Sequence, residues 1–337
     1  MDRIEGLKEY VKTKQYRTAL GLPGEQKEEY VLLAQGEYNM NYRFTHPVTG
    51  RELLLRVNCG SQMHLADQIG YEAHALKLLE GSGRTPEVLY VDGSKKEISR
   101  GVLVMEYLPG RTLNYHTELS NAAACLADIH SVRIPEAEDV LIRPGKALHA
   151  ILSECEEMFR VYEESPLGDD KKKKRIREMV SAGWQKAEKM NVEGGYQCCI
   201  NTELNSTNFL INGGGKTDYL IDWEKPLYGN PAQDLGHFLA PTTTFWKTDV
   251  ILSPKTVEAF IDEYICRVDG RFDTGQIREH THAFIPITCL RGITWCAMAW
   301  VQYQNPDKLI VNESTSRKLE AYLDMEFLEN IYNEYLR

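Results

Sequence analysis

One short stretch of the chain combines carboxylates with an amide at a spacing that suits phosphate chemistry. Glu203 lies in a polar loop, and Asn208 follows it five residues later. Two apolar runs, 209–211 and 219–221, then flank three consecutive glycines, and Asp222 stands directly after the second run. This pattern predicts a hairpin that returns Asp222 to the side of Asn208. Phosphoryl transfer needs a carboxylate to orient the attacking hydroxyl, and an amide with a second carboxylate to hold magnesium on the phosphates. The three residues therefore predict a phosphotransferase site.

The residues that follow this hairpin resemble those of a known family. Three motifs are similar to the segment after the metal-binding aspartate in the aminoglycoside phosphotransferase and choline kinase family: Asp222-Trp223-Glu224, Tyr228-Gly229-Asn230-Pro231 and Asp234-Leu235. The resemblance implies a kinase-like fold that uses ATP and Mg²⁺. It makes Asn208 and Asp222 the metal ligands and Glu203 the catalytic base. We also expect Asp234 to cap or anchor the loop after Pro231.

The loop departs from the family pattern at its beginning. The family has His, then Gly or Asn, then Asp, where this chain has Asn201, Thr202 and Glu203. A glutamate carries its carboxylate about 1.5 Å further from the backbone than an aspartate. A misplacement of 1 Å can cost roughly a hundredfold in rate. Two interpretations therefore stay open: an active kinase for a hydroxyl of a small metabolite, or a pseudokinase that senses nucleotide or mediates interactions. The presence of Asn208 and Asp222 favours the enzyme.

Apolar and alternating runs predict a small sheet with flanking helices in the first third of the chain. The expected helices are 5–20 and 63–79, and the expected strands are 30–34, 42–45, 52–57, 88–91 and 101–106.

By resemblance, these elements supply the nucleotide-binding side of the site. The turn with Gly36 and Asn39 covers the phosphates, and Arg56 on the third strand takes the place of the usual lysine, as in choline and ethanolamine kinases. Glu72 follows sixteen residues later on the apolar face of its helix, and we expect it to pair with Arg56. The alternatives are an ordinary hairpin at Gly36 and a surface glutamate at Glu72.

The segment Met105–Leu113 resembles the hinge between the lobes of the family. The backbone groups of Glu106, Tyr107 and Leu108 would bind adenine there. The predicted fold class is α+β, a protein-kinase-like two-lobed fold with nucleotide in the cleft. Residues 1–107 form the small antiparallel-sheet N-lobe, and residues 108–337 form the larger helical C-lobe with the catalytic loop and the acceptor-binding region.

The rest of the chain is predicted to be helical, and it contains the candidate acceptor-binding residues. Helices are expected at 120–132, 145–163, 170–190, 256–268, 278–303 and 314–335. His130 is expected to be a structural histidine of the core. On the helix 288–303, Trp295, Trp300 and Tyr303 form one broad aromatic arc. Choline kinases use such residues as a cation–π cage, whereas the alternative is a hydrophobic core helix. Asn201 and Glu224 complete the set of substrate-binding candidates.

Composition excludes several classes of protein. The net charge of −10 argues against nucleic-acid binding, because no overall basic field exists. The eight cysteines show no CxxC pair or zinc spacing, which indicates reduced thiols in a cytoplasmic protein. The N-terminus lacks a signal-peptide pattern, and the apolar run 293–301 is too short to span a membrane. The predicted partner is a small-molecule acceptor, an amino alcohol like choline or ethanolamine or an aminoglycoside, and a homodimer stays open.

Overall fold

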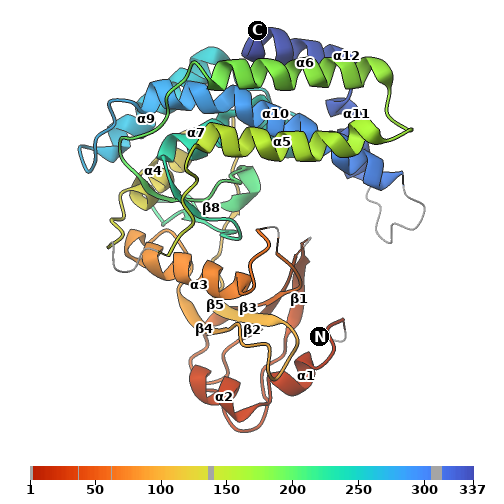
Figure 1. The fold of residues 1–337 in the computed structure, drawn as a ribbon. Helices are drawn as coiled ribbons and strands as arrows, with labels where there is room; N and C mark the ends of the chain where they lie inside the picture. Colours follow the sequence, from red (N-terminus) through yellow and green to blue (C-terminus); the bar gives the residue numbers. More distant parts are fainter. Residues whose placement is uncertain (1–2, 37, 62, 136–139, 305–312) are drawn as a thin grey trace. The chain divides into compact units, whose positions relative to one another are not determined.

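The structure is a computed structural model that describes residues 3–36, 38–61, 63–135, 140–304 and 313–337 (Figure 1). Its contacts divide the chain into two compact units. The first unit comprises Met1–Thr112, Val132–Leu141 and Asn208–Pro226, and the second comprises Leu113–Ser131, Ile142–Thr207 and Leu227–Arg337.

This division differs from the expected one at residues 107 and 108. The hairpin after the catalytic loop belongs to the first unit, because its strand β8 (Phe209–Ile211) pairs with β6 (Arg111–Thr112). The backbone N–H of Leu220 in β9 (Tyr219–Leu220) also donates to the carbonyl of Arg84 at 2.8 Å. Asn208 and Asp222 therefore lie in the same unit as the N-terminal sheet.

The first unit contains a five-stranded antiparallel sheet, which confirms the predicted fold class. The strand order is β1-β2-β3-β5-β4, and the strands are β1 (Val31–Gln35), β2 (Asn39–Thr45), β3 (Glu52–Asn58), β4 (Val88–Asp92) and β5 (Gly101–Glu106). Alternate residues of β2, Met40, Tyr42 and Phe44, are buried. Side chains on one face of an antiparallel sheet recur every second residue, so these three point into one core.

Two short helices complete that core where the sequence predicts one helix. α1 (Leu7–Tyr10) and α2 (Lys14–Leu20) are separate because Thr13 has an extended backbone and its hydroxyl caps α2, accepting from the N–H of Tyr16. Leu7, Tyr10 and Tyr16 are buried against the sheet residues.

Helix α3 (Gln68–Leu79) begins five residues later than expected. The side chain of Asp67 accepts a hydrogen bond from the N–H of Gly70 at 2.9 Å and caps the helix at this position. A 3₁₀ turn, η1 (Glu80–Ser82), follows. Glu72 is buried on this helix, so it is not the surface glutamate of the alternative interpretation.

The β8–β9 hairpin forms as the sequence predicts. Its turn contains Gly213, Gly214 and Gly215 with φ of 64°, 58° and 75°. Left-handed φ values are unfavourable for residues with a Cβ, so three consecutive glycines suit this turn.

The second unit is built mainly from helices around one long central helix (Figure 1). Its elements are α4 (Leu119–His130), α5 (Ala147–Glu164), α6 (Asp170–Ala187), β7 (Cys198–Ile200), β10 (Leu227–Gly229), α7 (Pro231–Leu239), α8 (Pro241–Thr248), α9 (Pro254–Val268), α10 (Ile277–Tyr303), α11 (Glu313–Tyr322), α12 (Met325–Ile331) and the π-helical η4 (Tyr332–Leu336). A 3₁₀ turn, η3 (Ser206–Asn208), ends the catalytic loop.

Helix α10 packs against α5, α6, α7, α8 and α11. Gly236 allows α7 to approach closely, because a Cβ there would lie 2.5 Å from the Cβ of Phe284. By length and composition, with a mean hydropathy of 1.4, α10 could cross a membrane, but 67% of its most apolar window is buried within the protein. This burial is typical of a core helix in a soluble protein.

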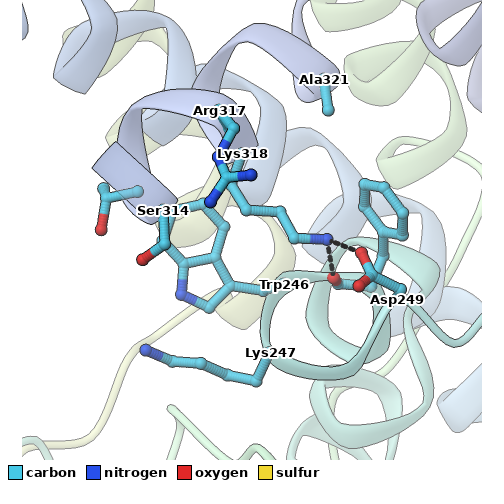
Figure 2. A pocket seen from close by; sticks show the side chains of 9 residues that line it. Trp246, Lys247, Asp249, Ser314, Arg317, Lys318 and Ala321 are labelled. Carbon is cyan, nitrogen blue, oxygen red and sulfur yellow. Dashed lines mark hydrogen bonds and ion pairs between the residues drawn. The ribbon is translucent and has the colours of Figure 1, made fainter. Parts of the chain in front are cut away.

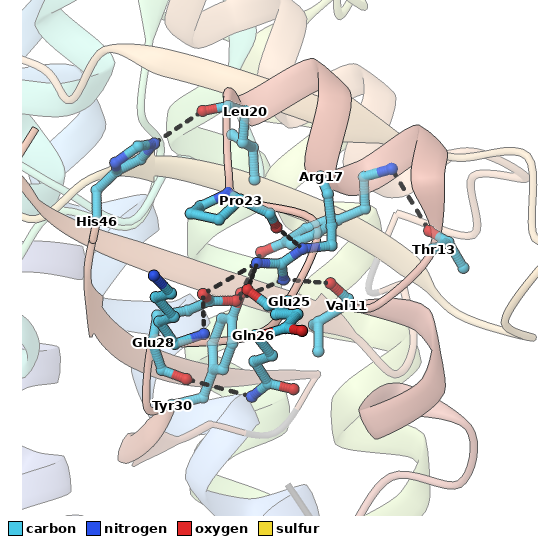
Figure 3. A network of polar contacts seen from close by, with 12 residues as sticks. Val11, Thr13, Arg17, Leu20, Pro23, Glu25, Gln26, Glu28, Tyr30 and His46 are labelled. Carbon is cyan, nitrogen blue, oxygen red and sulfur yellow. Dashed lines mark hydrogen bonds and ion pairs between the residues drawn. The ribbon is translucent and has the colours of Figure 1, made fainter. Parts of the chain in front are cut away.

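A buried ion pair joins α2 to the segment that leads into β1 (Figure 3). Arg17 donates to Glu28 at 2.8 and 3.3 Å, and also to the carbonyl oxygens of Val11, Pro23 and Glu25. The exposed fractions of the two charged side chains are 4% and 0%. Burial raises the pKa of Glu28, but hydrogen bonds from Arg17 and the backbone outweigh this effect and lower it. The stability that Glu28 contributes is therefore present at neutral pH and is lost on acidification below its ordinary value of 4.5.

We expect Arg17→Met to lower the free energy of unfolding by about 3 kcal/mol, because it leaves the Glu28 carboxylate buried without its cation. Urea unfolding at neutral pH measures the loss. Arg43→Met is the matched control, since its pair with Glu52 is exposed and such pairs contribute less than about 1 kcal/mol. Equal losses in the two variants would contradict this interpretation of Figure 3.

Candidate active site

A cluster of charged side chains surrounds Arg56 in the first unit. Arg56 on β3 donates to Glu72 on α3, which forms the expected ion pair. Its guanidinium also lies 3.6 Å from the carboxylate of Asp222 and 3.7 Å from that of Glu224. Its Nε donates to the side-chain oxygen of Asn41 at 3.0 Å, a contact with β2 that the sequence did not indicate. One arginine thus connects two strands, a helix and the segment after β9.

The cluster has three carboxylates around one cation. Burial lowers the pKa of a guanidinium, but the three acidic neighbours outweigh it and raise the pKa of Arg56, which therefore stays charged. Burial and the charge of Asp222 raise the pKa of Glu72, and they raise the pKa of Glu224 to about 8. Within the described part of the chain, Oε2 of Glu72 is buried without a hydrogen-bond partner. Carboxyl groups crowded around one cation form an environment that a divalent cation stabilises.

The donor groups of Asn208 and Asp222 fit one Mg²⁺ ion. The Nδ2 of Asn208 donates to the Asp222 carboxylate at 3.5 Å, so the two side chains are adjacent, and the backbone N–H of Ile221 donates to the backbone carbonyl of Asn208 at 2.9 Å. Mg²⁺ binds oxygen atoms, which the Asp222 carboxylate and the amide oxygen of Asn208 supply. The described residues contain no group of three or more His, Cys, Asp or Glu side chains arranged for a metal. Mg²⁺ that binds nucleotides takes its other ligands from phosphates and water, so this pair is sufficient.

A cavity of about 190 Å³ lies within the first unit beside these groups. Its lining joins apolar side chains to the charged cluster and consists of Leu33, Leu54, Arg56, Glu72, Leu76, Pro86, Met105, Glu106, Tyr107, Leu108, Gly110, Leu210, Ile221, Asp222 and Trp223. The three expected hinge residues are all part of this lining. The cavity is smaller than the roughly 300–1,000 Å³ of sites for drug-sized ligands, so it suits one flat ring system.

The backbone of the hinge is partly used by the sheet itself. The N–H of Glu106 donates to the carbonyl of Glu87 at 2.9 Å, and the N–H of Tyr107 donates to that of Glu52 at 3.0 Å. The N–H of Leu108 makes no backbone hydrogen bond to the residues that the structure describes. Of the three expected amide donors, Leu108 is therefore the one that can serve a ligand.

Gly36 lies just after β1, and Asn39 is the first residue of β2. The N–H of Gly36 donates to the carbonyl of Asn39 at 2.9 Å, whereas Glu37 of the expected turn lies outside the described residues. The side chain of Asn39 accepts from Asn58 at 3.0 Å and donates to Glu224. Both of these contacts of the Asn39 side chain are with protein groups, and they position Glu224.

The catalytic loop belongs to the second unit, where Asp234 holds its backbone. The carboxylate of Asp234 is fully buried and accepts from the N–H groups of Asn201 at 2.8 Å and Thr202 at 2.7 Å. His130 approaches the same carboxylate at 3.2 Å and the hydroxyl of Tyr264 at 2.9 Å, which agrees with its expected structural role.

The structure shows what Asp234 and Asn201 contact beside this loop. Asp234 anchors the catalytic loop, whereas the residues after Pro231 form helix α7, which Asn230 caps by accepting from the N–H of Ala232. Asn201 is a candidate substrate ligand by sequence, but its side-chain oxygen accepts from the N–H of Glu203 at 3.2 Å. Asn201 therefore shapes the turn that presents Glu203.

The loop carries backbone strain at Thr202. Its φ is 72°, in the left-handed region that Thr, being β-branched, rarely adopts. The family pattern has Gly or Asn at this position, and both residues tolerate a left-handed backbone. The two hydrogen bonds to Asp234 enclose this strained peptide and hold it in place.

The structure also shows a contact that sequence reasoning missed. Arg291 on α10 donates to Oε1 of Glu203 at 2.8 Å, and to both oxygens of Glu154 on α5 at 3.0 and 3.2 Å. Burial lowers the pKa of Arg291, but the two carboxylates outweigh it and raise the pKa, so the guanidinium stays charged. The sequence separation of 88 residues between Arg291 and Glu203 explains why no local pattern revealed the pair.

The aromatic residues of α10 pack within the second unit. Trp295 stands edge-on to Trp246 with 5.3 Å between ring centroids, and the indole N–H of Trp300 donates to Glu320 at 2.6 Å. Trp295, Trp300 and Tyr303 all contact one cluster of buried and half-buried residues formed with Cys296, Ala299, Leu319, Tyr322, Phe245, Trp246 and Phe327. These contacts favour the core-helix alternative over an aromatic cage.

A hollow of about 450 Å³ beside this cluster has a cationic lining (Figure 2). Lys318 lies 3.6 Å from the ring centroid of Phe245 and pairs with Asp249, and Lys247 lies 5.8 Å from that of Trp246. Ser314, Thr315, Arg317 and Ala321 complete the lining. A trimethylammonium ligand here would meet ammonium groups of the chain itself, so the cage stays a prediction that this hollow does not support.

Comparisons with known proteins agree with this geometry. The sequence profile described as "Phosphotransferase enzyme family" matches residues 29–280, which is more than half of the chain. No curated protein sequence matches the chain.

Three solved structures illustrate the shared fold. Spectinomycin phosphotransferase, in complex with ADP and spectinomycin, has a TM-score of 0.67 at 12% identity, covering 97% of this chain and 98% of its own. The choline kinase of Cryptosporidium parvum has a TM-score of 0.66 at 13% identity, covering 97% of both chains. The ethanolamine kinase of Plasmodium vivax has a TM-score of 0.63 at 15% identity, covering 96% and 89%.

We expect Thr202→Asn to raise the free energy of unfolding by about 1 kcal/mol, because asparagine adopts the left-handed region with less strain. Thermal unfolding of the full chain measures the change. Thr207→Asn in the same loop is the matched control, since its φ is not positive and no strain is relieved there. If Thr202→Asn raised the free energy of unfolding no more than Thr207→Asn does, Thr202 would not be strained.

Proposed function

The chain belongs to the phosphotransferase enzyme family and is a small-molecule phosphotransferase; we propose that it transfers the terminal phosphoryl group of ATP, with Mg²⁺, to a hydroxyl group. The observation that carries this proposal is the Arg56 cluster with the adjacent Asn208–Asp222 pair. A buried cation beside two groups that suit Mg²⁺ is the arrangement that phosphates of a nucleotide require.

The adenine ring of the nucleotide would bind in the 190 Å³ cavity of the first unit. Its apolar walls suit adenine, and the N–H of Leu108 supplies a donor for the ring edge. Arg56 would contact the phosphates, while Glu72 keeps the guanidinium oriented. Gly36, in the turn before β2, would bring backbone close to the phosphates.

Asn208 and Asp222 would hold the metal. When bound, Mg²⁺ neutralises the charge that develops on the phosphates during transfer. Glu224 stands 3.7 Å from Arg56 and its pKa is raised to about 8, so a metal ion held nearby would favour its charged form. Asn39 and the side chain of Gln68, which donates to the Glu224 carbonyl at 2.7 Å, hold Glu224 in position.

Glu203 would orient the acceptor hydroxyl and take its proton. A base in such a reaction must lie within hydrogen-bond reach of the hydroxyl, so its position matters most. Asp234 holds the backbone on one side of Glu203, and Arg291 holds its carboxylate. Glu203 and Asn208 are five residues apart in one loop, which keeps base and metal ligand on one short segment.

The proposed acceptor is a cationic small molecule, an amino alcohol or an aminoglycoside. Two carboxylates, those of Glu154 and Glu203, lie within hydrogen-bond distance of Arg291 and bring negative charge to the proposed base. Such a charge attracts an ammonium group on the acceptor. The names of the structurally similar proteins, which include spectinomycin, choline and ethanolamine, are consistent with this class.

We also propose a cytoplasmic location. All eight cysteines are described, and each is a free thiol. Six of them are buried, and a reducing compartment preserves such thiols.

A transfer assay with γ-labelled ATP tests the proposal on the full chain. The acceptors are choline, ethanolamine, spectinomycin, a simple sugar and a nucleoside, each with MgCl₂ and with EDTA. We expect Mg²⁺-dependent transfer to an amino-bearing acceptor. Asp222→Ala and Glu203→Gln should each lower kcat by about 10²-fold or more, because one removes a metal ligand and the other the base. Glu157→Gln, at an exposed glutamate of the second unit, is the control for Glu203→Gln and should match the parent.

The outcomes separate the parts of the proposal. Transfer to the sugar or nucleoside alone would contradict the cationic acceptor but keep the reaction. Full activity of Glu203→Gln would show that another group is the base. Tight binding of MgATP without transfer to any acceptor would favour a pseudokinase over the enzyme.

A further inference from the structure

The carboxylate of Glu203 is held by a guanidinium that is itself held by a second carboxylate. Arg291 forms two hydrogen bonds with Glu154, one to each carboxylate oxygen, at 3.0 and 3.2 Å. Such a two-point contact sets the plane of the guanidinium as well as its position. The same Nη2 then donates to Oε1 of Glu203 at 2.8 Å. The orientation of Glu203 thus depends on α10 and α5, two helices that pack against each other.

This triad lies in a partly desolvated setting. The exposed fractions of the side chains are 16% for Arg291, 31% for Glu154 and 35% for Glu203. A charge pair with this much burial is screened less than a surface pair. Glutamate has more side-chain rotamer freedom than aspartate, and a fixed cation removes it before the acceptor arrives.

The length of Glu203 matches this contact. An aspartate at the same backbone position would end about 1.5 Å short. Its oxygen would then lie roughly 4 Å from Arg291, beyond hydrogen-bond distance. The glutamate and the arginine therefore depend on each other, and the departure from the usual aspartate has a structural counterpart 88 residues away.

We infer that Arg291 is a positioning residue that adapts the site to a glutamate base, an inference that rests on the proposed function. A carboxylate offers about four lone-pair sites, and the hydrogen bond from Arg291 occupies one of them. Glu203 can therefore still accept the proton of the acceptor hydroxyl. Arg291 acts through Glu203 and needs no contact with the substrate.

A double-mutant cycle on the full chain tests the inference. The variants are Arg291→Met, Glu203→Asp and the combination, and kcat is measured for phosphoryl transfer to the best acceptor among choline, ethanolamine and spectinomycin. We expect Arg291→Met to lower kcat by about tenfold or more in the parent, since misplacing a catalytic group by about 1 Å has effects of up to a hundredfold. In the Glu203→Asp background the same change should cost less than about threefold, because the contact is already lost.

Two further readouts distinguish positioning from a merely structural role. The affinity for ATP, which binds in the other unit, should stay within about twofold of the parent for each variant. Arg291→Lys keeps the positive charge and should recover part of kcat. If Arg291→Met does not fold, Arg291→Lys replaces it in the double-mutant cycle.

The possible failures are distinct. A parent that turns over, with Arg291→Met costing the same factor in both backgrounds, would overturn the inference alone. The inference would also fail if Arg291→Lys and Arg291→Met lost activity only in proportion to lost folded protein. A parent that binds ATP but transfers no phosphate would overturn the proposed function and the inference with it.

Discussion

The ion pairs of Arg56 are the interaction on which the first unit depends. A guanidinium with 8% of its side chain exposed is stable only because Glu72, Asp222 and Glu224 surround it. These partners come from α3 and from the segment after β9, so one buried charge fixes the mutual positions of a strand, a helix and a hairpin. Three carboxyl groups crowd around this one guanidinium, and this crowding suits the cluster to a metal ion and phosphates as well as to stability.

The second unit uses the same principle around the catalytic loop. A buried carboxylate, Asp234, holds the loop backbone through two N–H groups, and a buried cation, Arg291, holds the side chain of Glu203. The strained φ of Thr202 lies between these two restraints. A strained loop persists only where its surroundings determine its conformation more strongly than its own preferences do. The two restraints that make the loop rigid therefore also keep the strained backbone of Thr202 in its conformation.

Local patterns allowed much of this to be predicted from the sequence. The β8–β9 hairpin, the strands and the pairing of Glu72 with Arg56 follow from short-range spacing and from a family resemblance. The break between α1 and α2 depended on one capping hydroxyl, that of Thr13, which a pattern of apolar residues does not reveal. Arg291 could not be predicted, because its partners lie on elements that meet only in the folded chain. The aromatic arc of α10 was visible in the sequence, but only packing shows that its rings contact a core cluster.

Calorimetric titration of the full chain with ATP, in MgCl₂ and in EDTA, tests the central claim most directly, because it needs no acceptor. If the carboxyl cluster around Arg56 is part of a metal–phosphate site, ATP should bind at least on the order of tenfold more tightly with Mg²⁺ than without it. Equal affinity under the two conditions, or no binding of ATP in either, would contradict the assignment of Arg56, Asn208 and Asp222 to a nucleotide and its metal.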